Sequence, residues 1–362
     1  MVEIVDLRND IQPFFHHEDA RLTEGISLAA ETDILYWVDI YKAQIHRIQN
    51  YSQVKDSSAK KDNYDFVTIS TQNYNETLFN VSYPKEHSNF KESIGVIFPN
   101  DDPETKHLIY FASKFGIGQF NFKTGEWGYI VLYSSCPILK PYSHKLRSND
   151  GNVTRDGKYI IVGLMEDFMF DAGNSDLGCV LKIDLTNRTI EVLINGLKIP
   201  NAFHWNKDNT KMYVTDSLNW TIWEYAYDSK QNKLINSEDR RALFDIKKFN
   251  SDFESPEPDG SAIDLTNGLI YVCLWSTSQI QAYDLETGNL VKKFLLPSST
   301  PRISCCCFAG NDLLVTSANI YVSDDEQKGN EQKDIKGGCL YRIPDAAQNL
   351  PLTSSTKVTL KF

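Results

Sequence analysis

Three residues with oxygen-bearing side chains stand at matching places along the chain: Glu24, Asn201 and Asp259. Each is followed by a small residue and a short apolar run, and each stands 12 residues before a tyrosine, at positions 36, 213 and 271. Equal offsets from equivalent strands are expected to bring these side chains to one height around a common axis. Converging carboxylates repel each other, and a divalent cation offsets that cost. We therefore expect a metal site built from these three residues.

The donor types indicate which metal ion such a site prefers. Oxygen ligands suit the hard ions Ca²⁺, Mg²⁺ and Mn²⁺, and carboxylates also bind Zn²⁺. No histidine shares the offset, so a zinc site built from histidines is not expected. A site with few protein ligands keeps open coordination positions, as catalytic metals require. We expect one divalent metal ion, Ca²⁺ in the first place, with Zn²⁺, Mn²⁺ and Mg²⁺ left open.

The chain contains a repeat that can carry such residues. Strand-like runs begin at residues 34, 108, 159, 212, 269 and 313, and each is followed by a second alternating run. From the second unit onward the starts lie 44 to 57 residues apart. Turns rich in Thr, Asn and Gly separate the runs, and no convincing amphipathic helix is found. Six units of about four strands predict an all-β fold, a six-bladed β-propeller with four-stranded antiparallel blades and the metal site in its central channel.

This architecture sets the expected domain organisation. Residues 1–362 are expected to form a single propeller domain, with polar loop insertions at about 50–65 and 323–338. An N-terminal strand, such as VEIVDL at 2–7, is needed to complete the last blade. The polar residues are expected just before, or at the start of, each innermost strand. A pair of β-sandwiches fits less well, because the unit length is regular and no linker is found.

Composition narrows the classes of partner. The chain carries 37 basic and 48 acidic residues, a net charge of -11, which argues against nucleic acid and anionic membrane surfaces. No apolar run is long enough to span a membrane, and the N-terminal segment lacks the apolar core of a secretory signal. Seven cysteines without a CxxC pair favour reduced, buried thiols in a cytoplasmic protein. A small-molecule partner is expected, and the oligomeric state stays open.

Five short stretches occur in an order typical of one protein family. They are TEGISL with ILYWVDI, RSNDGNVTRDGKYIIVGLM, IPNAFHWNKDNTKMYVTDS, PDGSAIDLTNGLIYV and ISCCCFAGNDLLVTSA. On these motifs the chain resembles the gluconolactonase/regucalcin (senescence-marker-protein) family. Its members are six-bladed propellers that bind a divalent metal and hydrolyse sugar lactones. The resemblance extends from about residue 21 to about residue 345.

The resemblance assigns the family's metal ligands to the same three residues, Glu24, Asn201 and Asp259. Two neighbouring positions depart from the family pattern. Ile26 stands where the family commonly has Pro, and Ala202 where it commonly has Gly. If that Gly adopts a positive φ, Ala202 is strained and the ligand before it is displaced.

The resemblance also implies how the substrate is held and opened. Substrate contacts are expected from Arg147 and Asn149, and a further one from Glu166 or Asp167. The metal is expected to polarise the lactone carbonyl or to activate water. Asp259, bound to the metal through one oxygen, is expected to accept the water's proton as general base. The implied activity is that of a metal-dependent lactonase, a gluconolactonase-like carboxylic ester hydrolase acting on sugar lactones.

Other functions remain open at this point. One is a calcium-binding regulatory propeller without physiological turnover. Another is a phosphotriesterase-like hydrolase on the same scaffold, with Asn149 as a fourth ligand. A third is a scaffold propeller without metal. The large aromatic residues, among them Trp37, Trp205 and Trp275, are expected to pack within the blades rather than to form a binding wall.

Overall fold

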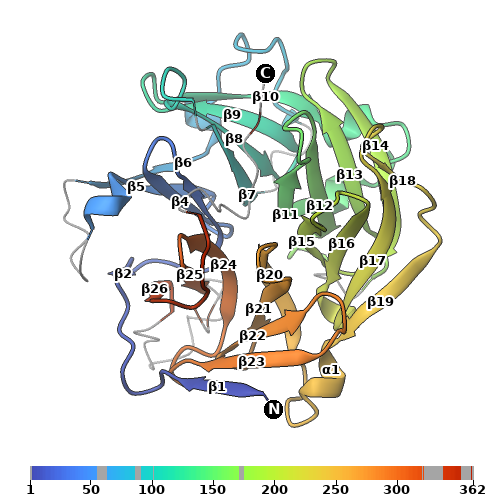
Figure 1. Ribbon diagram of the computed structural model, residues 1–362. Coiled ribbons are helices and arrows are strands. Elements are labelled where there is room, and N and C mark those ends of the chain that lie inside the picture. The colour runs from blue at the N-terminus through green and yellow to red at the C-terminus, as the bar shows by residue number, and fades with distance from the viewer. Residues whose placement is uncertain are drawn as a thin grey trace.

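The described part of the chain forms six sheets arranged as blades around a central axis, as the computed structural model shows (Figure 1). The structure describes residues 2–54, 63–85, 91–100, 102–170, 175–319, 321, 337–351 and 360. Most of the two predicted loop insertions, residues 55–62 and 322–336, lies outside the described residues. The ring of blades confirms the prediction of an all-β, six-bladed propeller.

The first three blades each contain four antiparallel strands that follow one another from the axis outward. Blade one consists of β3 (Thr23–Ala29), β4 (Ile34–Asp39), β5 (Gln44–Gln49) and β6 (Tyr64–Thr68). Blade two consists of β7 (Ile94–Pro99), β8 (Leu108–Ser113), β9 (Gly116–Asn121) and β10 (Glu126–Leu132). Blade three consists of β11 (Leu146–Val153), β12 (Ile160–Glu166), β13 (Gly178–Asp184) and β14 (Thr189–Leu197).

The other three blades repeat this order with additions at their outer edges. Blade four contains β15 (Pro200–Trp205), β16 (Lys211–Asp216), β17 (Thr221–Asp228) and β19 (Arg240–Asp245), with the short β18 (Lys233–Leu234) also beside β17. Blade five contains β20 (Glu257–Asp264), β21 (Leu269–Trp275), β22 (Gln279–Asp284) and β23 (Leu290–Leu295). Blade six contains β24 (Ile303–Ala309), β25 (Asp312–Ser317) and β26 (Cys339–Ile343). Helical structure in the described residues is limited to α1 (Ile246–Phe249) and single 3₁₀ turns, as expected.

The N-terminal segment closes the ring, although not through the strand that the sequence suggested. β2 (Phe15–His16) pairs with β26 and is the fourth strand of blade six. β1 (Glu3–Asp6), which lies in the VEIVDL segment, pairs in parallel with β23 and extends blade five instead. The expectation that VEIVDL completes the last blade is therefore wrong. Blade five offers β1 a free outer edge, whereas the edge of blade six is filled by β2.

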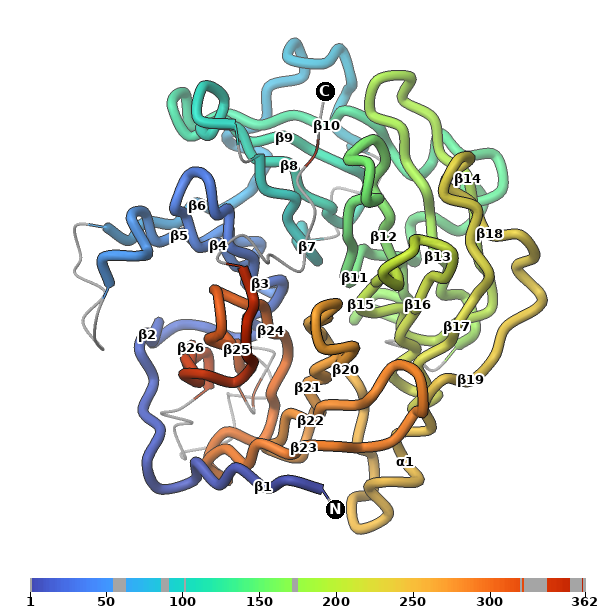
Figure 2. Tube along the Cα trace, viewed as in Figure 1, coloured from blue at the N-terminus to red at the C-terminus, as the bar shows by residue number. Residues whose placement is uncertain are grey.

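The strands that surround the axis are β3, β7, β11, β15, β20 and β24, and each contacts the innermost strand of the next blade (Figure 2). Asn201 therefore lies inside an innermost strand, β15, and the run at 212 is the second strand of its blade. The sequence placed these polar residues before strands such as the run at 212, but they lie within the strand that precedes each such run. The polar residues belong to the strands that line the channel.

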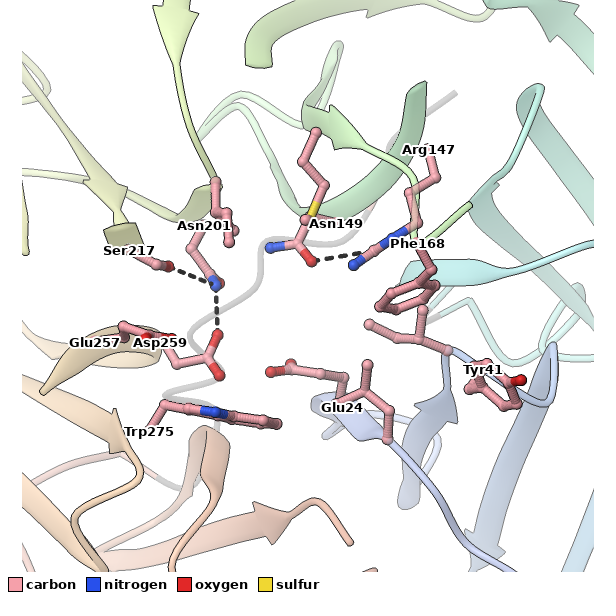
Figure 3. A pocket seen from close by; sticks show the side chains of 14 residues that line it. Glu24, Tyr41, Arg147, Asn149, Phe168, Asn201, Ser217, Glu257, Asp259 and Trp275 are labelled. Atoms are coloured by element: carbon pink, nitrogen blue, oxygen red, sulfur yellow. Dashed lines mark hydrogen bonds between the residues drawn. The ribbon is translucent and has the colours of Figure 1, made fainter. Parts of the chain in front are cut away.

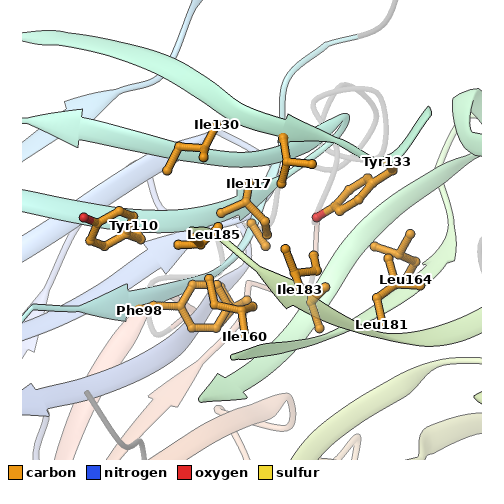
Figure 4. Close-up of a cluster of buried hydrophobic side chains, with 14 of the residues drawn as sticks. Phe98, Tyr110, Ile117, Ile130, Tyr133, Ile160, Leu164, Leu181, Ile183 and Leu185 are labelled. Carbon is orange, nitrogen blue, oxygen red and sulfur yellow. The ribbon is translucent and has the colours of Figure 1, made fainter. Parts of the chain in front are cut away.

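Apolar side chains fill the space between neighbouring blades. In β12, Ile160, Val162 and Leu164 face the cluster shared with blade two, which Figure 4 shows in close-up. Ile161, between them in sequence, packs instead with blade four, together with Phe203. This alternation follows the period of two of a strand with both faces buried. It fixes each blade against both neighbours and so fixes the direction in which its innermost strand points.

Two further expectations concern buried residues. All seven cysteines are free and buried, which confirms that they are unpaired apolar residues of the core. Trp37 and Trp205 pack within blade cores, as expected, whereas Trp275 lines the central cavity. No helix among the described residues has the length and apolar character needed to cross a membrane.

Candidate functional site

Each innermost strand contains a β-bulge close to the end that carries the polar residues. The register shifts between Glu24 and Ser27 in β3, Ser148 and Gly151 in β11, Pro200 and Phe203 in β15, and Pro258 and Ser261 in β20, with equivalent shifts in β7 and β24. A bulge adds one residue to a strand and changes the direction of the side chains beside it. Repeated in every blade, it turns polar side chains toward the axis of the ring.

The residues that follow the predicted ligands meet three different requirements. Gly25 adopts a φ of 59°, a conformation that favours glycine. Gly260 has no positive φ, but a Cβ there would lie 2.6 Å from Sγ of Cys305. Ala202 is not among the described residues with a positive φ, so the strain considered for it does not arise. Asn201 is therefore held in its strand without a glycine beside it.

A cavity of about 440 Å³ opens at the axis, on the side where the bulges lie (Figure 3). It is lined by Leu22, Glu24, Ile40, Tyr41, Arg147, Asn149, Met165, Phe168, Ile199, Asn201, Ser217, Glu257, Asp259 and Trp275. Its volume lies within the usual range for small-molecule sites. The structure thus brings five of the predicted site residues into one cavity, from four different blades.

Asn201 and Asp259 are in direct contact across the boundary between blades four and five. The Nδ2 of Asn201 donates a hydrogen bond to Oδ1 of Asp259 and another, at 3.3 Å, to Oγ of Ser217. Its Oδ1 accepts from the backbone N–H of Ala202 at 3.0 Å. Asn201 is 2% exposed, so these bonds fix the amide in place. A half-turn of this amide would give up the bond from Ala202 and present oxygen to the cavity instead.

Glu24 places a second carboxylate beside Asp259, as Figure 3 shows. Its Oε2 accepts a hydrogen bond of 2.7 Å from the backbone N–H of Gly25. Burial raises the pKa of Asp259 well above its ordinary value, and the negative charge of Glu24 raises it further. The hydrogen bond from Asn201 acts in the opposite direction and is a smaller effect. The two carboxylates therefore form a pair in which adding a cation relieves repulsion.

Arg147 occupies the opposite side of the cavity and is 3% exposed. Its Nη1 donates to the backbone oxygen of Ser148 at 2.8 Å and to Oδ1 of Asn149 at 3.3 Å. The guanidinium lies 4.2 Å from the ring centre of Phe168. Burial lowers its pKa to about 10, which leaves it charged at neutral pH. Its buried Nε has no hydrogen-bond partner in the structure, so the group keeps donor capacity.

The two acidic candidates for a further substrate contact lie outside this cavity lining. Glu166 ends β12, and its carboxylate accepts a hydrogen bond from Oγ of Ser175. Asp167 forms a buried ion pair with Lys114. Neither belongs to the residues that line the cavity, so a substrate contact through Glu166 stays a prediction.

Several cavity residues were not identified from the sequence. Glu257 lies two positions before Asp259 on the same strand, a spacing that places both on one face and could have revealed it. Tyr41, Phe168, Ser217 and Trp275 lie at strand ends or in connections. No repeat in the sequence marks those positions.

Among the described residues, no three His, Cys, Asp or Glu side chains are gathered closely enough to hold a metal ion. The predicted ligand set contains only two carboxylates, and its third member is the amide of Asn201. It therefore does not require a group of three His, Cys, Asp or Glu side chains. A metal site is accordingly not shown by the structure.

Comparisons with known proteins agree with the propeller fold. An uncharacterized protein of Saccharomyces cerevisiae is 44% identical over 97% of this chain and 96% of its own length. A calcium-binding protein, regucalcin, from Agrobacterium tumefaciens superimposes with a TM-score of 0.69 at 17% identity, over 99% of this chain and 98% of that one. A gluconolactonase from Xanthomonas campestris gives a TM-score of 0.58 at 15% identity, over 95% of this chain and 90% of that one. At these identities the two structures support the fold alone.

The comparison with family profiles covers most of the chain. The profile described as the SMP-30/Gluconolactonase/LRE-like region matches residues 22–319. That segment begins just before β3 and ends just after β25, so it contains all six innermost strands and every residue of the cavity lining. The chain therefore belongs to the SMP-30/gluconolactonase/LRE-like family.

Proposed function

We propose that this protein is a metal-dependent hydrolase that opens lactones, with sugar lactones as the class that the sequence resemblance implies. The observation that carries the proposal is the meeting of Glu24, Asn201 and Asp259 in one cavity at the axis. Membership of the SMP-30/gluconolactonase/LRE-like family supports it. So do the names of two structural neighbours, a gluconolactonase and a calcium-binding regucalcin.

The chemistry of the three side chains fits a divalent cation. Two carboxylates lie beside each other, and burial, followed by the negative charge of Glu24, raises the pKa of Asp259. The amide of Asn201 contacts the same carboxylate, and its oxygen would join the ligands if the amide turned toward the ion. Oxygen donors of this kind suit Ca²⁺ and also bind Mg²⁺, Mn²⁺ or Zn²⁺. A bound divalent ion supplies Lewis acidity for the lactone carbonyl and lowers the pKa of a coordinated water.

The chain's own residues then have distinct roles. Asp259 would hold the ion through one carboxylate oxygen, and its other oxygen could accept the proton of the attacking water as general base. Arg147 and Asn149 orient the substrate from the opposite wall. The apolar residues around them exclude water from the reacting ester. Glu166 is kept as a candidate for a further contact that forms when substrate is bound.

Turnover and metal binding together test the proposal. The purified chain is treated with chelator, reloaded separately with Ca²⁺, Zn²⁺, Mn²⁺ or Mg²⁺, and assayed on a panel of lactones. We expect hydrolysis only after reloading, and loss of hydrolysis with retained folding in Asp259→Asn. Metal binding without hydrolysis of any lactone would instead support the calcium-binding alternative. Hydrolysis that survives complete metal removal contradicts the proposal.

A further inference from the structure

The wall of the central cavity has a large apolar part, which offers few hydrogen-bond partners to a polyhydroxylated ring. Half of the lining residues are aliphatic, aromatic or thioether side chains: Leu22, Ile40, Tyr41, Met165, Phe168, Ile199 and Trp275. They come from the connections and strand ends around the same mouth, including those that follow β4 and β12. Asn201, Ser217 and Glu257 gather around the carboxylate of Asp259 at one side of the cavity, and Arg147 lies at the other (Figure 3).

Both carboxamides in the lining, Asn149 and Asn201, are already engaged within the protein. Asn201 bonds Asp259, Ser217 and a backbone N–H. Asn149 donates to the backbone oxygen of Pro200 at 3.3 Å and accepts from Arg147. Hydroxyl groups that face the aliphatic part of the wall would be buried without partners. Each buried hydroxyl left unpaired costs about 1–3 kcal/mol.

The aromatic walls are held in place by cations outside the cavity. The guanidinium of Arg302 lies 5.2 Å from the ring centre of Trp275, and Nζ of Lys91 lies 4.3 Å from that of Tyr41. Tyr41 also contacts Phe168 edge to face, with ring centres 6.0 Å apart. Cation–π contacts of this kind fix the rings and leave their other faces available. The walls are therefore preformed rather than assembled by the ligand.

The apolar wall continues from the cavity to the surface. Phe168, Met169 and Phe170 follow one another after β12 and are 37%, 59% and 39% exposed. Exposed neighbouring apolar side chains beside a site are a sign of contact with an apolar ligand or partner. Here the first of them lines the cavity itself, so a chain leaving the cavity has an apolar surface to lie on.

We propose, resting on the lactonase function proposed above, that the substrate is a lactone whose ring carries an alkyl or aryl substituent rather than a full set of hydroxyl groups. The ester group faces Glu24, Asn201 and Asp259. The substituent lies against Phe168, Tyr41 and Trp275. Hydrolysis adds hydroxide to the carbonyl carbon, breaks its bond to the ring oxygen and returns a proton to that oxygen, so a hydroxy acid leaves without any redox change.

A sugar ring also stacks on aromatic residues through its C–H groups, so the aromatic rings alone do not decide between the two substrate types. The aliphatic part of the wall distinguishes the two substrate types, because Leu22, Ile40 and Ile199 offer no partner to a hydroxyl group. An alkyl group there is removed from water and gains about fourfold in affinity for each methylene buried.

Binding of lactams, which resemble lactones but resist hydrolysis, tests this inference separately from turnover. The metal-loaded chain is titrated calorimetrically with unsubstituted δ-valerolactam, a propyl- and a pentyl-substituted δ-lactam, and D-glucono-δ-lactam. We expect affinity to rise about fourfold per methylene along the alkyl series, with a negative heat-capacity change. D-glucono-δ-lactam is expected to bind at least about tenfold more weakly than the pentyl compound. Equal or tighter binding of the glucono compound overturns the inference.

Substitutions at the wall locate the effect. Phe168→Ser is expected to weaken pentyl-lactam binding about tenfold more than it weakens binding of unsubstituted δ-valerolactam, while Phe168→Leu keeps most of the affinity. Ile235, which is 70% exposed and outside the cavity, provides a matched control as Ile235→Ser. An affinity ratio that Phe168→Ser does not change contradicts the proposed position of the substituent.

The two proposals fail in different ways. If the pentyl-lactam binds as described but no lactone is hydrolysed with any metal, the lactonase function is wrong and the preference for an apolar ligand stands. If gluconolactone is hydrolysed and bound better than the alkyl lactones, the lactonase function stands and the substituted-lactone substrate is wrong.

Discussion

The side-chain amide of Asn201 donates a hydrogen bond to the carboxylate of Asp259, although the two residues are 58 positions apart and belong to different blades. This contact forms because equivalent bulges in β15 and β20 turn both side chains to the axis. It joins a neutral donor to an acid whose pKa is raised by burial and by Glu24. The pair is the structural basis of the metal site proposed above.

Replacement of the amide tests its part in that site. Asn201→Leu is expected to lower Ca²⁺ affinity at least about 100-fold, because even indirect supporting groups contribute 10- to 100-fold at metal sites. Calorimetric titration with Ca²⁺ measures the loss. Asn149→Ala is the matched comparison, with the same side chain removed from blade three. We expect it to keep the metal affinity and to raise KM, whereas the phosphotriesterase-like alternative requires it to weaken metal binding.

Removal of the buried cation Lys114, which contacts the start of β11, should destabilise the fold. Lys114 is 0% exposed, pairs with Asp167 and donates to the backbone oxygens of His144 and Leu146, at 3.0 and 2.9 Å. Lys114→Met strands the Asp167 carboxylate, so the free energy of unfolding should fall by about 3–5 kcal/mol. Denaturant titration measures this change.

A double variant provides the control for this prediction. Lys114→Met combined with Asp167→Leu removes both charges and should recover a large part of the lost stability. A double variant as unstable as Lys114→Met alone would show that the backbone contacts of Lys114, and not the ion pair, hold the start of β11.

Stability should fall as the pH rises toward neutrality because of one buried acid. Burial raises the pKa of Glu92 from 4.5 to about 7, although Tyr83 and Tyr129 each donate to its Oε1 at 2.8 Å. The folded state holds this proton more tightly than the unfolded state. Its stabilising effect is therefore complete below about pH 4.5 and is lost as the pH rises through about 7, a change of about 3 kcal/mol.

The variant Glu92→Gln isolates this effect, because its amide oxygen can still accept from both tyrosines. Unfolding free energies of wild type and variant are measured between pH 4 and pH 8. The decline contributed by Glu92 should be absent from the variant. Parallel curves for the two proteins would show that the proton is not taken up by Glu92.

The three positions that follow the predicted ligands should differ in how much stability a substitution costs. Gly25→Ala places a side chain at a φ of 59° without a close contact, so the cost is the backbone strain of about 1–2 kcal/mol. Gly260→Ala meets Cys305 at 2.6 Å and should cost more. Ala202→Gly should cost only about 0.5–1 kcal/mol, through chain entropy. Thermal unfolding measures the loss of stability in each of the three variants. If Ala202→Gly were the most destabilised of them, this explanation would be contradicted.

Much of the fold was predictable because it repeats. Apolar runs at regular spacing indicate equivalent blades, and the shared offset of Glu24, Asn201 and Asp259 from tyrosines indicates a common height in the ring. The structure places these three residues in one cavity. The predicted metal itself stays a proposal, since side-chain geometry alone does not identify an ion.

The remaining features depend on local irregularities that periodicity does not reveal. A bulge breaks the alternation of β15, so Asn201 was assigned to the approach of the following strand rather than to the innermost one. The N-terminal pairing was misjudged because β2 contains only two residues, too few for a pattern. Phe168 and Trp275 come from a connection and a strand end, where no repeat predicts which way a side chain points.

Anomalous diffraction from crystals soaked with Mn²⁺ tests whether the three side chains bind one ion. We expect a single strong peak in the axial cavity, about 2.0–2.6 Å from oxygen atoms of Glu24, Asn201 and Asp259, with the Asn201 amide turned so that its oxygen faces the ion. A map without a peak among these residues, or with Nδ2 of Asn201 still donating to Asp259 in the presence of saturating metal, would contradict the proposed site.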